Sequence, residues 1–162
     1  MNKINRVKSE YLFPVIIELI QNNQKATITV TGNSMSPFLK EIRDRVELSA
    51  TSFNEIKRGD IVLIRRKTGY YVMHRVFKKE KDCFFLVGDA QEWIEGSLYP
   101  DQLIAIVKRV WRKNREISCD NIIWKFLSLL WLHLRKHRYT IFKINKIFKQ
   151  FKAKLSWRKS VN

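Results

Sequence analysis

The sequence predicts a mainly β protein: a small coiled antiparallel sheet or barrel with a short N-terminal helix and a basic amphipathic C-terminal helical tail. Short runs rich in Val, Ile, Phe and Tyr alternate with turn residues through the middle of the chain. An apolar face at helical spacing precedes these runs, and a helical pattern dense in Lys and Arg follows them. The length of 162 residues, 45% of them hydrophobic, fits one domain with an appendage.

The first expected element is a helix over residues 9–22, because its apolar residues recur on one face. Six β-like runs follow, at 26–31, 45–49, 60–66, 70–77, 83–87 and 103–111. Their close spacing, with polar turns between them, favours an antiparallel sheet or small barrel. We therefore expect an N-terminal helical segment over 1–25, a β domain over 26–118 and a helical tail over 119–162.

The tail carries much of the positive charge. The net charge is +17, and residues 121–162 hold eleven Lys or Arg and no Asp or Glu. Asp120 or Asn121 is expected to cap the first helix of the tail. Farther on, an apolar stripe is formed by Ile141, Ile144, Ile147, Phe148, Phe151 and Leu155, and lysines fall outside it.

A basic amphipathic helix with aromatic residues is typical of an element that lies in a membrane interface, and Trp124, Trp131 and Trp157 fit that position. Two alternatives stay open. The stripe could pack on the protein's own sheet, or the tail could bind nucleic acid. The aliphatic stripe and the lack of a reading motif argue against nucleic acid.

Other classes are disfavoured by what the chain lacks. Residues 11–20 are apolar but interrupted, and no cleavage site of a signal peptide follows. The longest apolar run, 122–134, is shorter than the roughly 20 residues of a spanning helix. Cys83 and Cys119 have no metal-type spacing, so reduced, partly buried thiols are expected, without a metal or cofactor.

A nucleophile, a base and an acid lie in or directly after three of the β-like runs. Ser34 lies on a Gly-Asn turn after the run 26–31, His74 lies inside the run 70–77, and Asp89 follows the run 83–87. A serine hydroxyl is a weak nucleophile at neutral pH and needs a base within hydrogen-bond reach. Neighbouring strands of one small sheet would bring these groups together.

Four ordered segments within about sixty residues carry a family resemblance. They are Gly32-Asn33-Ser34-Met35-Ser36-Pro37, Arg58-Gly59-Asp60-Ile61-Val62, Met73-His74-Arg75-Val76 and Gly88-Asp89-Ala90-Gln91. They resemble the motif boxes of type I signal peptidases, in particular the serine–histidine subgroup of archaea and the endoplasmic reticulum. The related self-cleaving repressors share the fold but use a lysine base, so the His-Arg pair here favours the peptidase subgroup.

The resemblance implies a role for each residue. Ser34 would attack a peptide carbonyl, His74 would take its proton and return it to the leaving amine, and Asp89 would orient the imidazole. Glu95 is the alternative acid, because the subgroup has a second acidic position six residues beyond Asp89. The Ser34 N–H would be one oxyanion donor. Relatives often place a hydroxyl where this chain has Gly32, so Asn33 or the backbone would have to replace that donor.

The predicted function is a serine endopeptidase, a signal-peptidase-like hydrolase that cleaves a leader- or signal-type peptide. Signal peptidases usually have an N-terminal membrane anchor, and the basic tail would replace it by docking on an anionic membrane, peripherally and on the cytoplasmic face. A re-entrant or short spanning helix over 122–134, which would place the domain on the other side, is the alternative. The alternatives are a catalytically weak peptide-binding module of the same fold and a basic nucleic-acid-binding protein.

Overall fold

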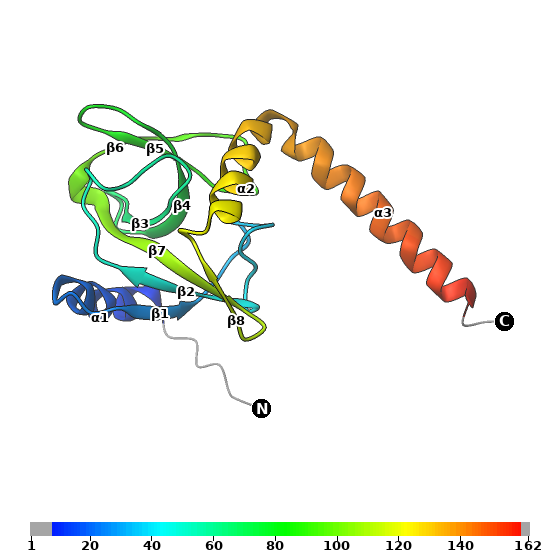
Figure 1. Cartoon of the computed structure of the whole chain (residues 1–162), viewed down its shortest axis with the longest axis horizontal. Helices are drawn as coiled ribbons and strands as arrows, with labels where there is room; N and C mark the ends of the chain where they lie inside the picture. The colour runs from blue at the N-terminus through cyan, green and yellow to red at the C-terminus, as the bar shows by residue number, and fades with distance from the viewer. Residues whose placement is uncertain (1–7, 160–162) are drawn as a thin grey trace.

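The computed structural model describes residues 8–159, a curled antiparallel sheet with helices at both ends of the chain (Figure 1). The strands are β1 Ala26–Thr29, β2 Asp44–Ser49, β3 Ile61–Arg65, β4 Tyr71–Lys79, β5 Phe84–Val87, β6 Glu95–Leu98, β7 Leu103–Arg112 and β8 Arg115–Ser118. The helices are α1 Ser9–Gln21, α2 Ile122–His133 and α3 Arg138–Lys159, with short 3₁₀ turns η1 Pro100–Gln102 and η2 Leu134–His137. The predicted mainly β fold with helical ends is confirmed.

The strands form one sheet in the order β1-β2-β7-β3-β4-β5-β6, and β8 pairs with β7. Every pairing is antiparallel. The long strand β7 pairs with both β2 and β3 and so joins the two halves of the sheet. Register shifts interrupt several of the ladders, and such bulges increase strand bending and twist. The sheet therefore curls, although among the described strands it does not close into a barrel.

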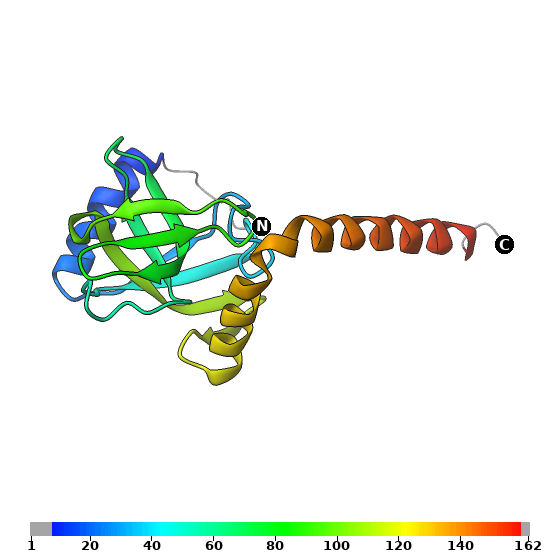
Figure 2. The same ribbon diagram turned by 90° about the horizontal axis from the view of Figure 1, so that it is seen from above.

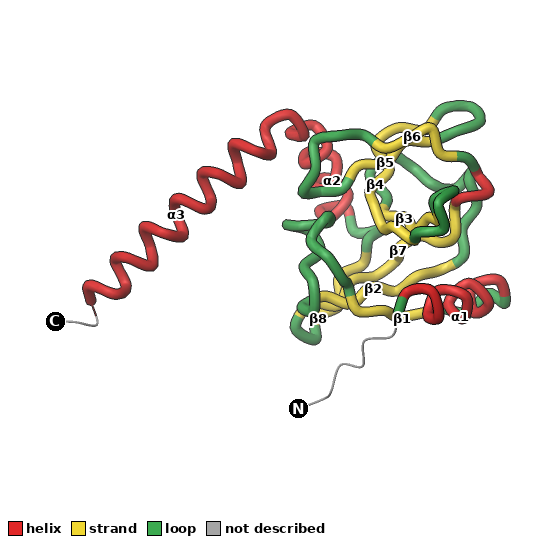
Figure 3. The backbone as a smooth tube through the Cα atoms, turned by 180° about the vertical axis from the view of Figure 1, so that it is seen from behind, coloured by secondary structure: helices red, strands yellow, loops and turns green. Residues whose placement is uncertain are grey.

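Helix α1 lies along β1 and covers one end of the curled sheet (Figure 3). Ile16 and Ile20 are buried with Val46 and Leu48 of β2 in the main core cluster. The Phe13 ring stacks on Tyr71 at a centroid separation of 4.3 Å. The N-terminal helix is therefore packed against the strand that carries His74.

Two strands were not predicted from the sequence. Strand β6 contains Glu95, Gly96 and Ser97, which have low β propensity. Strand β8 returns from β7 through Lys113 and Asn114, whose φ angles of 48° and 64° match a type I′ hairpin turn. Both strands owe their conformation to pairing with a neighbour rather than to their own composition.

Helix α2 packs on the domain through one narrow stripe. Asn121 caps it, as one of the two predicted candidates, by accepting hydrogen bonds from the backbone N–H groups of Ile123 and Trp124. Trp124 is buried and meets Phe38 edge to face at 5.4 Å. The prediction that Trp124 lies in a membrane interface is therefore wrong, because its ring packs against the domain.

Helix α3 projects away from the domain (Figure 2). Ile144, Ile147 and Phe148 are exposed, so this part of the apolar stripe does not pack on the sheet. The side chains of Phe151, Leu155 and Trp157 lie outside the described residues. No helix within 8–159 is long and apolar enough to cross a membrane.

Candidate active site

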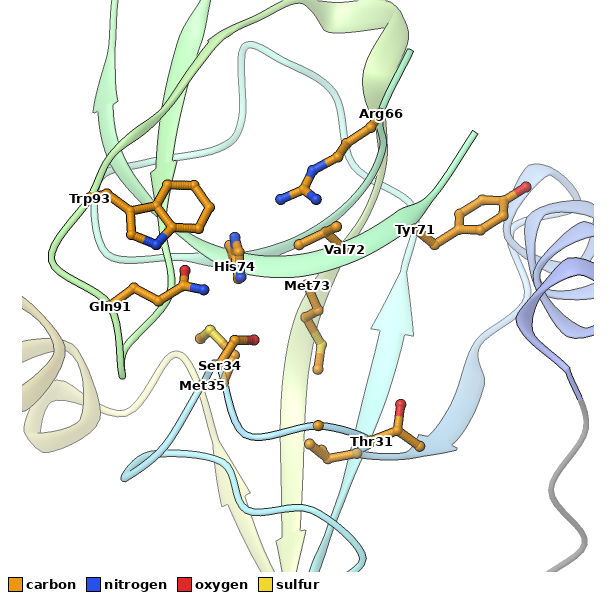
Figure 4. Close-up of a pocket in the computed structure, with 12 residues that line it drawn as sticks. Thr31, Ser34, Met35, Arg66, Tyr71, Val72, Met73, His74, Gln91 and Trp93 are labelled. Atoms are coloured by element: carbon orange, nitrogen blue, oxygen red, sulfur yellow. The ribbon is translucent and has the colours of Figure 1, made fainter. Parts of the chain in front are cut away.

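A cavity of about 350 Å³ lies between the loop after β1 and the first half of β4. Ser34 and His74 both line it, and Figure 4 shows them in the same space, with Gln91 and Trp93 beside them. The other lining residues are Val30, Thr31, Gly32, Met35, Arg66, Tyr71, Val72 and Met73. The structure thus brings the predicted nucleophile and base together.

The loop that carries Ser34 is held at both sides. Gly32 has φ +78°, a left-handed conformation that glycine adopts without strain, and it begins the turn. Met35 is buried in the core directly after the serine. The Ser34 carbonyl accepts a hydrogen bond from the Ala90 N–H at 2.8 Å. Ser34 itself stays half-buried, which leaves its hydroxyl reachable from the cavity.

His74 lies in the middle of β4 with only 3% of its surface exposed. Its Nδ1 lies 3.3 Å from Oε2 of Glu95, although the angle falls short of a hydrogen bond. The Glu95 carboxylate also accepts two hydrogen bonds from the Arg66 guanidinium, one from Nε to Oε1 and one from Nη2 to Oε2 at 2.7 Å. The imidazole is therefore backed by a fixed carboxylate at Nδ1, which leaves Nε2 for the cavity.

No hydrogen bond joins the Ser34 hydroxyl to His74 among the residues that the structure describes. In free enzymes such catalytic hydrogen bonds are often long and tighten only when substrate binds. Rotation of the Ser34 side chain about its Cα–Cβ bond can change the direction of Oγ without moving the backbone. Because Ser34 and His74 line the same cavity, the distance between Oγ and the imidazole can shorten when a substrate binds.

The electrostatics keep the imidazole neutral near pH 7. Burial lowers the pKa of His74 below its ordinary value of 6.5, and the Glu95 carboxylate offsets only part of that effect. Burial acts to raise the pKa of Glu95, but the Arg66 guanidinium and the His74 imidazole together outweigh it, and the pKa is lowered overall. A neutral imidazole beside an ionised carboxylate is the protonation state that a general base needs.

The structure differs from the prediction for Asp89. Its two carboxylate oxygens accept hydrogen bonds from Arg75 Nε at 2.8 Å and Nη2 at 2.6 Å, and both side chains have no exposed surface. Arg75 also donates to the Gly59 carbonyl at 2.7 Å. With both oxygens engaged by Arg75, Asp89 is a structural ion-pair partner, and Glu95 takes the place beside the imidazole.

Of the two predicted replacements for the hydroxyl that is missing at Gly32, Asn33 and the backbone, the structure places Asn33 away from the cavity. The Asn33 amide reaches Glu41, with Nδ2 3.5 Å from Oε2, and Asn33 does not line the cavity. Gln91 does line it, and its side-chain amide points toward Ser34 and His74 in Figure 4. The Gln91 side chain can take this position because residue 88 is a glycine. A Cβ at Gly88 would lie 2.4 Å from Gln91 Oε1 and 2.8 Å from the Ser34 carbonyl oxygen.

Residues 3–116 match the family described as Peptidase S24-like. This chain belongs to the S24-like peptidase family. No curated protein and no solved structure matches it. The family match supports a serine-peptidase-type fold, and it does not specify the signal-peptidase subgroup. Helices α2 and α3 of this S24-like protein lie beyond the matched residues.

Sequence reasoning missed several residues of the site. Arg66 is one basic residue among many, and only the fold shows that it holds Glu95. Trp93 meets the His74 ring edge to face at 6.4 Å, from a segment with no strong pattern. The signal in the sequence for Glu95 as the acid is its spacing of six residues from Asp89, which is weaker than the Gly-Asp motif that contains Asp89.

Proposed function

We propose that this chain is a serine endopeptidase that cleaves leader- or signal-type peptides through an acyl-enzyme on Ser34. The observation that carries the proposal is the shared cavity, in which Ser34 faces a buried neutral His74 that is backed by Glu95. No lysine lines this cavity within the described residues, which favours histidine over lysine as the base.

The reaction begins when Ser34 Oγ attacks the scissile carbonyl and passes its proton to Nε2 of His74. The imidazolium is stabilised by Glu95, and it returns the proton to the leaving amine as the C–N bond breaks. Water then attacks the acyl-enzyme, again with His74 as base, and releases Ser34. The Ser34 N–H is the backbone candidate for stabilising the oxyanion in both steps.

The substrate peptide is proposed to bind as an added strand. Residues 71–73 of β4 pair with β3 on one side, whereas pairing with β5 begins only at Arg75. The other edge of 71–73 is thus unpaired among the described strands, and it borders the cavity opposite residues 30–32. An extended peptide inserted there would gain main-chain hydrogen bonds and present its carbonyl to Ser34.

A second candidate is a peptide-binding module of the same fold with weak catalysis. It is favoured by Gly32, which leaves the oxyanion site without a side-chain hydroxyl. Loss of one oxyanion donor lowers kcat by about two to three orders of magnitude in serine peptidases. Such a module would bind peptides along the β4 edge and turn them over slowly.

Cleavage of a peptide library by the wild type, Ser34→Ala and His74→Ala tests the peptidase proposal. Ser36→Ala is the matched control, because it removes a neighbouring hydroxyl of the same loop. We expect cleavage by the wild type and the control, and background cleavage by the other two variants. Cleavage that survives Ser34→Ala would refute the proposal, whereas peptide binding without cleavage would favour the weak module.

We further propose that the enzyme docks peripherally on an anionic membrane, on the cytoplasmic face. Outside its buried stripe, α2 presents an exposed apolar surface made of Ile122, Ile123, Phe126, Leu127, Leu129 and Leu130. Ile122 is 81% exposed. The adjoining α3 carries the exposed cations Lys143 and Lys146, and each cation near an anionic surface contributes about 1 kcal/mol.

Co-sedimentation with vesicles tests docking on the full-length protein. We expect binding to vesicles with anionic lipid, weak binding to neutral vesicles, and a loss of about tenfold or more when Ile123 and Phe126 are both changed to Asp. Tyr70→Asp is the control, because Tyr70 is exposed on the turn between β3 and β4 and does not belong to α2 or α3. Equal binding of the double variant and the control, or equal binding to both vesicle types, would rule docking out.

A further inference from the structure

The loop 88–92 is held by the C-terminal segment through its backbone carbonyls. Arg138 Nη1 donates to the carbonyls of Gly88 and Gln91, each at 2.7 Å. Trp131 Nε1 donates to the Asp89 carbonyl at 2.9 Å, and Arg135 donates to the Glu92 carbonyl. Four carbonyls of a five-residue loop are thus bound by three side chains that lie far along the chain.

Arg138 is the central contact of this arrangement. It is fully buried, and its Nη2 also donates to the Trp131 carbonyl at 3.1 Å. Its guanidinium lies over the Trp131 ring at 5.3 Å. Its hydrogen bonds go to backbone carbonyls rather than to a carboxylate, and burial lowers its pKa to about 10, so it remains charged at neutral pH. A buried charge is tolerated only where hydrogen bonds satisfy it, and a satisfied buried network makes its surroundings more rigid. Here the partners are backbone carbonyls of the loop 88–92 and of Trp131.

The same loop reaches the catalytic residues directly. Its Ala90 N–H donates to the Ser34 carbonyl, and its Gln91 side chain lines the cavity (Figure 4). A displacement of the loop would therefore move the backbone of the nucleophile and one wall of the substrate cavity together. A shift of about 1 Å in catalytic geometry can lower the rate about 100-fold.

We propose that Arg138, assisted by Trp131, is a positioning residue for the Ser34 site. It anchors the loop 88–92 and so fixes the nucleophile loop and the Gln91 amide for catalysis. This inference rests on the proposed peptidase function. It also makes the region around the start of α3 part of the catalytic unit, although that region lies beyond the S24-like match.

The test combines hydrogen exchange with peptide cleavage in the full-length protein. Arg138→Lys keeps the charge but offers a single nitrogen in place of the two guanidinium nitrogens, Nη1 and Nη2, that Arg138 uses. Trp131→Phe removes the Nε1 donor and leaves a smaller aromatic ring. Lys136→Ala is the control, because Lys136 is exposed on the intervening turn. We expect exchange over 86–94 and 32–39 to be about tenfold faster or more in Arg138→Lys, because a bond from a charged donor is weakened. In Trp131→Phe, which loses a neutral donor, we expect exchange about two- to tenfold faster.

Cleavage is expected to fall by about 10- to 100-fold in kcat for Arg138→Lys and less for Trp131→Phe, with KM little changed and the pH profile of His74 preserved. If Arg138→Lys does not fold, exchange and cleavage measured on Trp131→Phe still test the proposal. Unchanged exchange in a folded variant would overturn the positioning role. Faster exchange in a protein whose wild type cleaves no peptide would instead refute the peptidase function and leave the anchoring role standing.

Discussion

Glu95→Gln and Asp89→Asn distinguish the roles of the two carboxylates that lie near Ser34 and His74, the proposed catalytic residues. Each substitution removes one charge with almost no change in shape. The structure pairs Glu95 with the imidazole and with a partly exposed Arg66, whereas Asp89 faces a fully buried Arg75. The first change should therefore act on catalysis, and the second on stability.

For Asp89→Asn the magnitude follows from burial. Removing one partner of a buried ion pair leaves an uncompensated charge and destabilises a protein by about 3–5 kcal/mol. For a chain of this size each kcal/mol lowers Tm by about 2–4 °C, so Tm should fall by roughly 6 to 20 °C. The Arg66 contact of Glu95 is closer to solvent, so Glu95→Gln should cost about 1 kcal/mol or less.

For Glu95→Gln the rate should fall by about 10²- to 10⁴-fold, because the imidazole loses the group that sets its tautomer and stabilises its cation. Glu95 is also the main influence that raises the pKa of His74 against burial. Its loss should therefore move the acid limb of kcat/KM to lower pH while the plateau falls. The assay is the pH profile of peptide cleavage beside thermal unfolding. A folded Asp89→Asn variant with the larger loss of rate, and an active Glu95→Gln variant, would refute this assignment.

Three further outcomes follow from the geometry. In the wild type, kcat/KM should rise with pH and level off with an apparent pKa below 6.5. The reason is that burial lowers the pKa of His74 and that the neutral imidazole is the proposed base. An apparent pKa above 7 would contradict this. Burial raises the pKa of Cys119 to about 12, so in a Cys83→Ser background its alkylation at pH 8 should be about three orders of magnitude slower than that of an ordinary thiol, measured by mass spectrometry. Gly59→Ala should lower the free energy of unfolding by about 1–2 kcal/mol or more, because its φ is +99° and a Cβ would lie 3.2 Å from Leu129. Gly69→Ala, with φ +90° and open space, should show the strain alone in the same denaturant titration.

The strands that are rich in apolar residues were predictable, because the apolar residues in the sequence are the ones that the sheet buries. The run 60–66 became β3, and the run 70–77 became most of β4. Strands β6 and β8 were not predictable, because their own residues do not favour a strand and pairing with a neighbouring strand decides their conformation. The ends of elements shifted for the same reason, as pairing with β5 extends β4 to Lys79.

The site divides in a similar way. Ser34 and His74 could be predicted because each lies in one of the ordered motif segments, at the position where the family resemblance expects a nucleophile and a base. The acid was ambiguous, because two carboxylates followed and only the fold shows that Arg75 engages Asp89. Arg138 could not have been found from its sequence, since it belongs to a run of basic residues that predicts a solvated or membrane-bound surface. Its role depends on a loop about fifty residues earlier in the chain.

Covalent trapping of the nucleophile tests the central claim most directly. A serine-reactive phosphonate is incubated with the full-length protein, and the adduct is located by intact mass and peptide mapping. We predict a single adduct on Ser34, no adduct in Ser34→Ala, and labelling in His74→Ala slowed by at least about 100-fold. An adduct on another residue, or labelling of Ser34 at the same rate without His74, would contradict the account.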